Sequence, residues 1–510
     1  MPVNGGMIVL VVEKNILMMN LNLIPMPASI RFMEGAFHCA GLPKIDGDPW
    51  FKTETAVFCG QMRMVFPQED SGVYIALKRM PQAEKREYYK LTIRPEGITV
   101  EAADEAGAYH GLQTLRQLFM TMDAEGLPCA VIEDYPQFPW RGLMLDCSRN
   151  FFTVEFIKKL IDALSMHHLN KFHWHLSDDQ GWRLPVEKYP LLTEIGSKRR
   201  DSRLIRDVYR GGFYTAAEIE DLIAWAAARH VEVVPEIDLP GHTSSVLAAY
   251  PGLGCTGGPY RVEERFGVFD DILCAGNDGL WDLAAAVFDT LASLFPSNYV
   301  HIGGDEVSFR RWAGCPKCRA KMEEWGVQKV SGLQARITAR LAAMLTERGK
   351  TPIGWDEVID NEEESKKLPQ DLIIMSWRGR VGGDRAVKMG RPVIMTPNSD
   401  GCYFDYKQKD SPEEPGQPYP KPFSLLYDFN PVSAGMTREE SALVLGGQGN
   451  LWTEYIYASK IAEYMIFPRL CALAEALWTP QANKNFEAFS RRLAVHNRRL
   501  ESLDILYCRH

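Results

Sequence analysis

Two adjacent carboxylates follow a pair of glycines directly after a short apolar run. The segment reads His301-Ile-Gly-Gly-Asp-Glu-Val307, and its acids are Asp305 and Glu306. Carboxyl groups held in a cleft serve as general acids and bases when burial or neighbouring charges shift their pKa values. A solvated acidic loop is the alternative, but the glycines and the position after a strand favour a site. The pair therefore predicts acid–base chemistry.

Other polar and aromatic side chains follow apolar runs in the same way. Eight such runs occupy residues 142–147, 171–176, 231–237, 299–302, 352–355, 372–377, 392–395 and 443–445. The side chains after them, in chain order, are Asp146 and Arg149; Asp178 and Asp179; Glu236, Asp238 and His242; Asp305 and Glu306; Trp355, Asp356 and Glu357; Trp377 and Arg378; Tyr403 and Asp405; Trp452 and Glu454. Groups of this kind at all eight strand ends indicate one shared pocket.

Helical periodicity separates most of these runs. A capping box, Thr215-Ala-Ala-Glu218, opens a helix over 219–229, and apolar residues recur every three or four positions in 156–167, 280–295 and 333–348. Strands that alternate with helices form parallel βα units. We therefore expect an α/β fold, a (β/α)8 TIM barrel, over residues 136–510.

A smaller α+β domain is predicted for residues 21–135. Strands are expected at 74–77, 87–93 and 97–100 and a helix at 105–120, and the domain ends at a linker rich in proline and aromatic residues over 134–140. Residues 1–20 form a leader of unclear structure whose apolar part, 7–12, is short. No signal-peptide cleavage site follows, so we expect a cytoplasmic protein, with periplasmic location or secretion as the alternative.

Composition and charge exclude several classes of partner and reaction. The chain has 510 residues and a net charge of -9, which gives no attraction to phosphate backbones, so nucleic acid is not an expected partner. No run reaches the roughly 18 apolar residues of a membrane span, so no membrane association is expected. The absence of a phosphate-binding loop and of a nucleophile elbow argues against phosphoryl transfer and serine or cysteine hydrolysis.

Two groups of residues offer metal-ligand chemistry. His173 and His175 lie on one face of a predicted strand, where zinc could bind with help from His301, Asp305 and Glu306. Because that pair lies below the barrel rim, hydrogen-bonded structural histidines are the favoured interpretation.

The second group is Cys315-Pro-Lys-Cys318, half of a zinc site or a redox pair, but no second such motif follows and incidental thiols are favoured. Cys255 and Cys274 flank one loop and could pair in an oxidising compartment. Taking both groups together, we predict no metal and no cofactor.

Together these motifs resemble glycoside hydrolase family 20, the β-N-acetylhexosaminidases. The matching stretches are 141–149, 171–179, 236–242, 301–306, 354–357, 376–377, 403–405 and 446–454, and they occur in the family's order. The N-terminal part, from Asn22-Leu-Ile-Pro-Met-Pro27 to 109–115, is similar to the small domain that precedes the barrel in this family. The resemblance covers residues 21–507 and implies the same two-domain fold.

The resemblance also implies a mechanism. Most glycosidases place two carboxylates across the sugar, about 5 Å apart for retention or 6.5–9.5 Å for inversion, and adjacent acids do not straddle a ring. In this family the substrate's own 2-acetamido oxygen attacks the anomeric carbon and forms an oxazolinium intermediate. By resemblance Glu306 is the general acid and later the base, Asp305 holds the acetamide N–H, and Tyr403 donates to the acetamide oxygen.

The resemblance assigns binding roles to the other strand-end residues. Trp355, Trp377 and Trp452 would enclose the sugar and its acetamido group, Arg149 and Glu454 would bind O3 and O4, and Asp405 would bind the O4/O6 side. Asp178 and His242 would form a relay that tunes the pKa of Glu306. Plainer alternatives remain, namely a structural ion pair at Arg149, comparable structural roles for Asp405 and Glu454, a bracing role for Asp178 and His242, and a core position for any one tryptophan.

Two residues depart from the family pattern. Asn150 stands where many relatives have histidine, and Cys402 precedes the key tyrosine. Neither change removes a catalytic group, although Asn150 bears on the geometry around Arg149.

We expect a retaining exo-β-N-acetylhexosaminidase acting on glycans that end in β-linked GlcNAc or GalNAc. The alternatives are a lacto-N-biosidase of the same family and an inactive glycan-binding protein, against which intact Asp305, Glu306 and Tyr403 argue. The sequence leaves the preferred sugar, the linkage and the choice between monomer and homodimer open.

Overall fold

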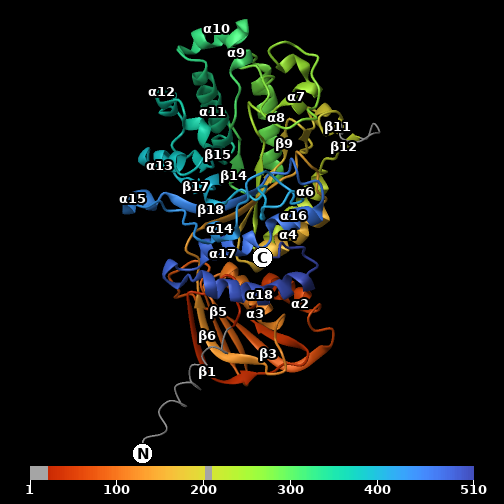
Figure 1. Cartoon of the computed structure of the whole chain (residues 1–510), viewed down its shortest axis with the longest axis vertical. Coiled ribbons are helices and arrows are strands. Elements are labelled where there is room, and N and C mark those ends of the chain that lie inside the picture. The colour runs from red at the N-terminus through yellow and green to blue at the C-terminus, as the bar shows by residue number, and fades with distance from the viewer. Residues whose placement is uncertain (1–20, 201–208, 510) are drawn as a thin grey trace, which may run out of the picture.

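The computed structural model describes residues 21–200 and 209–509, which form an N-terminal α+β unit and a larger barrel (Figure 1). The predicted leader, residues 1–20, lies outside the described residues. In Figure 1 the sheet of the N-terminal unit is at the bottom, and α18 (Phe486–Ser502) lies between it and the barrel.

The barrel consists of eight parallel strands, which confirms the predicted fold. Its members are β7 (Trp140–Asp146), β8 (Lys171–His175), β13 (Glu232–Glu236), β14 (Tyr299–His301), β15 (Thr351–Trp355), β16 (Ile373–Ser376), β17 (Val393–Met395) and β18 (Val444–Leu451). They close in the order β13-β14-β15-β16-β17-β18-β7-β8. Each coincides with one of the eight apolar runs of the sequence.

The last strand, β18, is longer than predicted. The apolar run suggested residues 443–445, but pairing with β7 continues through Gly446-Gly-Gln-Gly-Asn450 to Leu451. The glycines are required by close neighbours, because a Cβ at Gly449 would lie 2.6 Å from the Phe404 ring and a Cβ at Gly446 would overlap the backbone of Trp140. A glycine-rich stretch carries no strand pattern, which is why the sequence did not show it.

Helices surround the barrel unevenly. The predicted helices are found as α4 (Val154–Met166), α6 (Ala216–Ala227), α8 (Gly279–Leu294) and α11 (Ser331–Thr346), and the capping box at Thr215 and Glu218 is present. The ring continues with α13 (Val381–Lys388), α16 (Ser459–Ile466) and α17 (Arg469–Trp478). Only short helices follow β15 and β17, namely α12 (Glu362–Ser365), α14 (Phe423–Tyr427) and α15 (Arg438–Ser441).

Smaller elements occupy the loops at the carboxyl ends of β8, β13 and β14. They are β9 (Ser177–Asp178), β10 (Gly181–Trp182), α5 (Leu191–Glu194), β11 (Lys198–Arg200), β12 (Tyr209–Gly211), α7 (Ser244–Ala249), α9 (Arg310–Gly314) and α10 (Pro316–Trp325). The longest insertions therefore lie on the side of the barrel where the acidic pair is found.

The N-terminal unit is a six-stranded sheet packed against two helices. Its strands are β1 (Ser29–Phe37), β2 (Leu42–Gly47), β3 (Glu69–Arg79), β4 (Tyr89–Arg94), β5 (Gly97–Ala102) and β6 (Leu127–Asp134), in the order β1-β6-β4-β5-β3-β2, and its helices are α2 (Lys52–Met62) and α3 (Glu105–Phe119). The predicted strands are β3, β4 and β5, and the predicted helix is α3. The edge strands β1 and β2 were not predicted because much of each is exposed and lacks a clean apolar alternation.

The two units share a buried interface at the amino ends of the barrel strands. Arg141, near the start of β7, pairs with Glu87 at 2.5 Å, and the Arg116 side chain of α3 pairs with Asp162 of α4 at 2.9 Å. Trp478 of α17 packs into the apolar core of the N-terminal unit. This arrangement leaves the carboxyl ends of the strands uncovered by the N-terminal unit.

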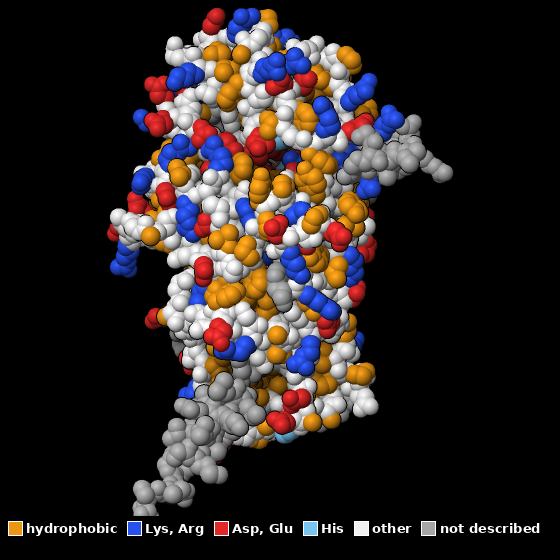
Figure 2. All heavy atoms as spheres, viewed as in Figure 1, with side chains coloured by type: hydrophobic (Ala, Val, Ile, Leu, Met, Phe, Trp, Pro, Cys, Tyr) orange, Lys and Arg blue, Asp and Glu red, His pale blue; other side chains and the backbone are white. Residues whose placement is uncertain are grey.

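Lys, Arg, Asp and Glu side chains intermix over the face of the molecule in Figure 2. None of the described helices is both long enough and apolar enough to cross a membrane.

Candidate active site at the carboxyl ends of the barrel strands

The acidic pair sits on a turn that only glycines can build. After β14 the chain passes through Gly303 (φ 66°) and Gly304 (φ 96°), both in the left-handed region. A Cβ at Gly303 would overlap the Asp238 side chain. The turn is held by the backbone N–H of Gly304, which donates to Asp238 at 2.8 Å, and by the Gln334 amide of α11, which donates to the Gly304 carbonyl at 2.7 Å.

This turn gives the two adjacent acids different surroundings. The side chain of Asp305 is 12% exposed, whereas that of Glu306 is 39% exposed and stands at the rim. Glu306 itself has φ 48°, an unusual conformation for a side chain of its size. The backbone therefore directs Asp305 into the barrel mouth and leaves Glu306 accessible.

Asp305 carries an unused acceptor. Among the residues that the structure describes, its buried Oδ1 has no hydrogen-bond partner. Burial raises the pKa of Asp305, although the positive charge of His242 and a hydrogen bond with Asp238 oppose that rise. A buried carboxylate oxygen without a donor is suited to accept an N–H from a bound molecule.

His242 connects the acidic pair to the rest of the pocket. Its Nε2 lies 3.5 Å from the Glu306 carboxylate and 3.9 Å from that of Asp305. Burial alone would lower the pKa of His242, but Asp178, Asp179 and Glu306 outweigh it and raise that pKa well above its usual range. In turn, the hydrogen bond and charge of His242 lower the pKa of Glu306.

Two acids contact His242, namely Asp178, its predicted relay partner, and the adjacent Asp179. His242 Nδ1 lies 3.0 Å from Asp179 and 3.3 Å from Asp178, so both acids of this pair face the imidazole. Asp179 is fixed by the backbone N–H and hydroxyl of Ser244, at 2.9 and 2.6 Å. The sequence placed Asp179 at the strand end, but the assignment of a role rested on Asp178 alone.

Asp178 extends this contact into the barrel. Its Oδ2 lies 2.8 Å from the Arg149 guanidinium and 3.0 Å from His175 Nε2. Burial would raise the pKa of Asp178, but Arg149, His242 and His175 lower it below its usual range. Asp178 therefore remains an anion between three cations.

The far end of the chain is Glu236, a fully buried carboxylate at the end of β13. His175 Nδ1 lies 2.6 Å from it, and His173 and His301 each lie 3.0 Å from it. The Trp355 indole donates to the same carboxylate at 2.9 Å. His175 and Trp355 hydrogen-bond to Glu236, and His173 and His301 lie within ion-pair distance of it, so the His173–His175 pair belongs to a network that centres on Glu236.

We name the series Glu236, His175, Asp178, His242 and Glu306 the acid–histidine chain. It runs from the floor of the barrel to the rim, and its anions and cations alternate. The carboxylates of this chain can lie close together because each of them contacts a histidine.

Four aromatic side chains form one wall of the pocket. Tyr403 and Trp377 stack with ring centroids 5.8 Å apart and planes 13° apart, and Trp452 lies 6.4 Å from Tyr403. Trp355 lies 5.9 Å from Trp452 and is fully buried, so it forms the floor behind the other three. The structure thus brings together all four predicted aromatic residues.

Trp377 and Tyr403 are each fixed by a neighbour. The Trp377 indole donates to both oxygens of Glu357, at 2.9 and 3.1 Å. Burial together with Asp305 and Asp356 raises the pKa of Glu357 to about 9. The backbone on both sides of Tyr403 hydrogen-bonds to Asn450 of β18 at 2.7 Å, so the tyrosine is held against the last strand.

Three further predicted residues, Arg149, Asp405 and Glu454, lie in the same pocket. The Arg149 guanidinium stacks over Trp452 at 5.0 Å and is also held by Gln180 at 3.1 Å. Asp405 Oδ1 and Glu454 Oε2 are buried and have no hydrogen-bond partner within the described part of the chain. Burial raises the pKa of both Asp405 and Glu454, and the charge of Glu454 adds to that effect on Asp405.

The two departures from the family pattern have local explanations. The Asn150 amide donates to the Thr453 carbonyl at 2.6 Å, and its backbone N–H reaches the Thr453 hydroxyl at 3.2 Å. Asn150 therefore ties the loop of Arg149 to the loop of Glu454. Cys402 is buried, and its carbonyl accepts one of the Asn450 hydrogen bonds.

The pocket contains the predicted site residues together with further residues that the structure adds. All eleven predicted site residues line the same end of the barrel. Asp179, Glu236, Asp238 and Glu357 also take part, although the sequence assigned them no individual role, and His175, predicted as a hydrogen-bonded structural histidine, joins them. Their strand-end positions were visible in the sequence. The pairing among them was not, because it depends on which side chains of neighbouring strands face each other.

Family models match both parts of the chain. The model described as "Glycosyl hydrolase family 20, catalytic domain" matches residues 138–481, and "Glycosyl hydrolase family 20, domain 2" matches residues 20–135.

Similar curated proteins are named as hexosaminidases. "Beta-hexosaminidase" of Porphyromonas gingivalis is 40% identical over 422 residues, which cover 80% of this chain and 53% of that protein. The chain therefore spans about half the length of that relative. "Beta-hexosaminidase" of Akkermansia muciniphila is 34% identical over 414 residues, which cover 80% of this chain and 82% of that protein.

Solved structures agree in fold across nearly the whole chain. A GH20 exo β-N-acetylglucosaminidase from Vibrio harveyi in complex with N-acetylglucosamine aligns with a TM-score of 0.86 and 31% identity, covering 96% of this chain and 78% of that chain. The N-acetyl-β-hexosaminidase of Streptomyces plicatus in complex with Thio-NAglucal aligns with a TM-score of 0.81 and 28% identity, covering 96% of each chain.

The acid–histidine chain predicts a large effect of removing its central anion. Glu236→Ala removes the acceptor of two buried donors, on His175 and Trp355, and the anion beside His173 and His301, so we expect the free energy of unfolding to fall by about 3 kcal/mol or more. Thermal unfolding followed by circular dichroism measures this. Glu439→Ala, on the exposed helix α15, is the control and should leave the midpoint in place. Equal midpoints for Glu236→Ala and wild type would contradict a paired Glu236.

Proposed function

This chain belongs to glycosyl hydrolase family 20, as its motifs predict, and on that basis we propose that it is a retaining exo-β-N-acetylhexosaminidase that uses substrate-assisted catalysis. It is a glycoside hydrolase, and the names of its relatives support hexosaminidase activity. The proposed substrates are glycans that end in a β-linked N-acetylhexosamine. The observation that carries the mechanism is the separation of roles between Asp305 and Glu306.

The nucleophile is the first element of the proposal. Asp305 and Glu306 are adjacent on one turn, so they do not stand on opposite sides of a sugar ring as an acid and an enzymic nucleophile would. The acetamido oxygen of the substrate supplies the missing nucleophile. It attacks the anomeric carbon while the bond to the leaving oxygen breaks, and a cyclic oxazolinium forms.

Asp305 orients the acetamide. Its unpartnered, buried Oδ1 accepts the acetamide N–H, and its negative charge stabilises the positive charge that develops on the ring. Tyr403 donates its hydroxyl hydrogen to the acetamide oxygen. Trp377 and Trp452, with Trp355 behind them, enclose the acetamido methyl group and exclude water from that side of the intermediate.

Glu306 moves the proton. At the rim, its carboxyl group protonates the leaving oxygen in the first step and then takes a proton from the water that opens the oxazolinium. The leaving group departs from one face of the sugar and the water later attacks the same face, so two inversions at the anomeric carbon give net retention. The accessible position of Glu306 suits this role because the leaving group departs toward solvent and the attacking water enters from solvent.

Exo action is the third element of the proposal. Arg149, Asp405 and Glu454 offer one cation and two acceptors for sugar hydroxyls. Hydroxyls of a terminal residue would occupy the two unpartnered carboxylate oxygens. A further sugar attached there would leave those oxygens buried and unsatisfied, which is costly.

Replacing the proposed acid tests this assignment. Glu306→Gln retains the shape of the side chain but cannot transfer a proton, so we expect kcat/KM on an unactivated β-GlcNAc disaccharide to fall by about 10²-fold or more. Substrates whose aryl leaving group needs no proton should retain much more activity in the first step. Steady-state rates over a series of aryl β-GlcNAc glycosides measure the difference.

Glu357→Gln is the matched control for this test, because Glu357 is a second pocket glutamate that orients Trp377 and transfers no proton in this scheme. The loss of kcat/KM caused by Glu357→Gln should be the same for substrates with good and with poor leaving groups. A Glu306→Gln variant with full activity on the disaccharide would reject the proposed acid.

The contact between His242 and Glu306 predicts a shift in the pH profile. His242 lowers the pKa of Glu306, so His242→Asn should raise that pKa. Because Glu306 must be protonated to act as the acid, its ionisation sets the alkaline limb of kcat/KM, and that limb should move to higher pH. Initial rates on an aryl β-GlcNAc across a pH series measure it.

His230→Asn provides the control, since His230 also has positive φ and lies far from the pocket beside Glu54. Its alkaline limb should coincide with that of wild type. A purely structural role for His242 would lower kcat/KM at every pH and leave the limb where it was.

A further inference from the structure

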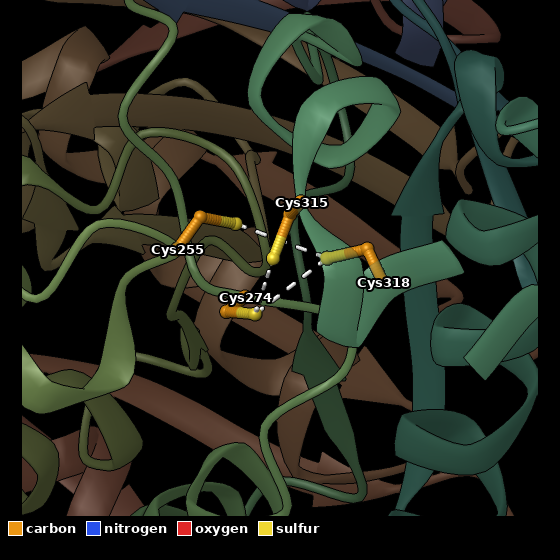
Figure 3. A group of neighbouring side chains, drawn as sticks. All are labelled: Cys255, Cys274, Cys315 and Cys318. Carbon is orange, nitrogen blue, oxygen red and sulfur yellow. Dashed lines mark hydrogen bonds between the residues drawn. The ribbon is translucent and has the colours of Figure 1, made fainter. Parts of the chain in front are cut away.

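Four cysteines from three separate segments meet beside the active-site loops. Cys255 follows the short turn η2 (Pro251–Leu253), Cys274 lies at the end of the same long loop, and Cys315 and Cys318 lie at the start of α10. Figure 3 shows the four side chains pointing toward one another. Their sulfur atoms all lie within 4.8 Å of one another.

The distances are those of a shared ion rather than of disulfides. The Sγ of Cys274 lies 3.5 Å from that of Cys318 and 3.8 Å from that of Cys315, and the Sγ of Cys255 lies 3.8 Å from that of Cys318. A disulfide requires about 2.05 Å between sulfurs, and none of the four cysteines is in a disulfide. A tetrahedral ion with bonds of about 2.3 Å to sulfur has sulfur–sulfur edges of about 3.8 Å.

The local backbone also matches a structural metal site. Cys315 and Cys318 are separated by two residues at a helix start, the spacing typical of one half of a four-cysteine zinc site. A Cβ at Gly276 would overlap the backbone of Lys317, so the loop closes onto the helix only with glycine there.

We propose that Cys255, Cys274, Cys315 and Cys318 bind one zinc ion as a structural tetrathiolate site. Four protein ligands complete a tetrahedron and leave no position for water or substrate, so the ion is not part of the hydrolytic chemistry. The site revises the prediction of no metal and the interpretation of Cys315 and Cys318 as incidental thiols. The sequence analysis considered Cys255 and Cys274 only as a possible disulfide, because their separation along the chain gives no sign that they meet Cys315 and Cys318.

The ion would join the two loops that carry the catalytic groups. The backbone N–H of Leu273 donates to the Thr243 hydroxyl at 3.2 Å, and Thr243 follows His242. The Trp312 indole of α9 donates to the Leu273 carbonyl at 2.9 Å, and α9 and α10 follow Glu306 along the chain. Zinc at the cysteine cluster thereby cross-links the loop of His242 to the segment after Glu306.

This position assigns the ion a supporting role in the proposed function. Loss of zinc should loosen the contact between His242 and Glu306 while every catalytic group stays in the chain. The metal site itself stands on the cysteine geometry and does not depend on which glycan is cleaved.

Metal analysis of the full-length protein tests the proposal. Protein purified with a reducing agent and without added metal should contain one zinc per chain by plasma mass spectrometry. Cys318→Ser should reduce zinc to the level of the buffer. Cys59→Ser, at a partly exposed cysteine of α2 outside the cluster, is the matched control and should retain the ion.

Cobalt exchange in the wild-type protein provides a second readout that needs no variant. Co²⁺ bound by four thiolates should produce the intense visible and charge-transfer absorption of tetrahedral cobalt thiolate, whether or not Cys318→Ser folds. Zinc-free protein whose four cysteines are alkylated as free thiols or recovered as disulfides would overturn the proposal. Iron in the site would overturn the assignment of zinc. Zinc content is measured without hydrolysis, so an inactive protein with one zinc would reject only the proposed function.

Discussion

Charge pairing inside the barrel mouth is the constraint on which the rest of the site depends. The pocket gathers many carboxylates in a volume that largely excludes water, and unpaired anions there would be costly to bury. The acid–histidine chain resolves this by alternating anions with imidazoles from Glu236 to Glu306. Arg149 supplies a further cation at Asp178. The same pairing that makes the pocket stable also orients His242 toward Glu306 and sets the pKa of that carboxyl group.

The acids that this chain does not pair are the ones available to a substrate. Asp305, Asp405 and Glu454 each retain a buried oxygen without a donor among the described residues. In the proposed function, Asp305 receives the acetamide, and Asp405 and Glu454 receive sugar hydroxyls. The left-handed turn at Gly303 and Gly304 sends the neighbouring carboxylates of Asp305 and Glu306 to different depths.

Most of the architecture could be predicted from the sequence because burial leaves a pattern in it. The eight barrel strands are apolar runs, and Asp305, Trp355, Tyr403 and the other strand-end residues converge because parallel strands of a barrel end on one side. Where burial leaves no such pattern, prediction was incomplete. The predicted strand was shorter than β18 because the glycines of β18 make room for Phe404 and Trp140 and contribute no apolar side chains.

Contacts between side chains of different strands and loops could not be predicted either. Glu236 was visible as a strand-end acid, but its contacts with three histidines depend on the register of β8, β13 and β14. In the same way Asp179 faces His242 beside Asp178, and Cys255 meets Cys318 only through loop closure. Such contacts join residues far apart in sequence, and one sequence alone contains no record of them.

In the proposed mechanism the substrate, and not the protein, supplies the nucleophile. A series of aryl β-GlcNAc substrates whose acetyl group carries zero, one, two or three fluorine atoms tests it most directly. Fluorine withdraws electrons from the acetamido oxygen and changes its size only slightly. The account predicts that kcat/KM falls steeply with each added fluorine. Rates that stay level across the series would contradict it and would point to an enzymic nucleophile.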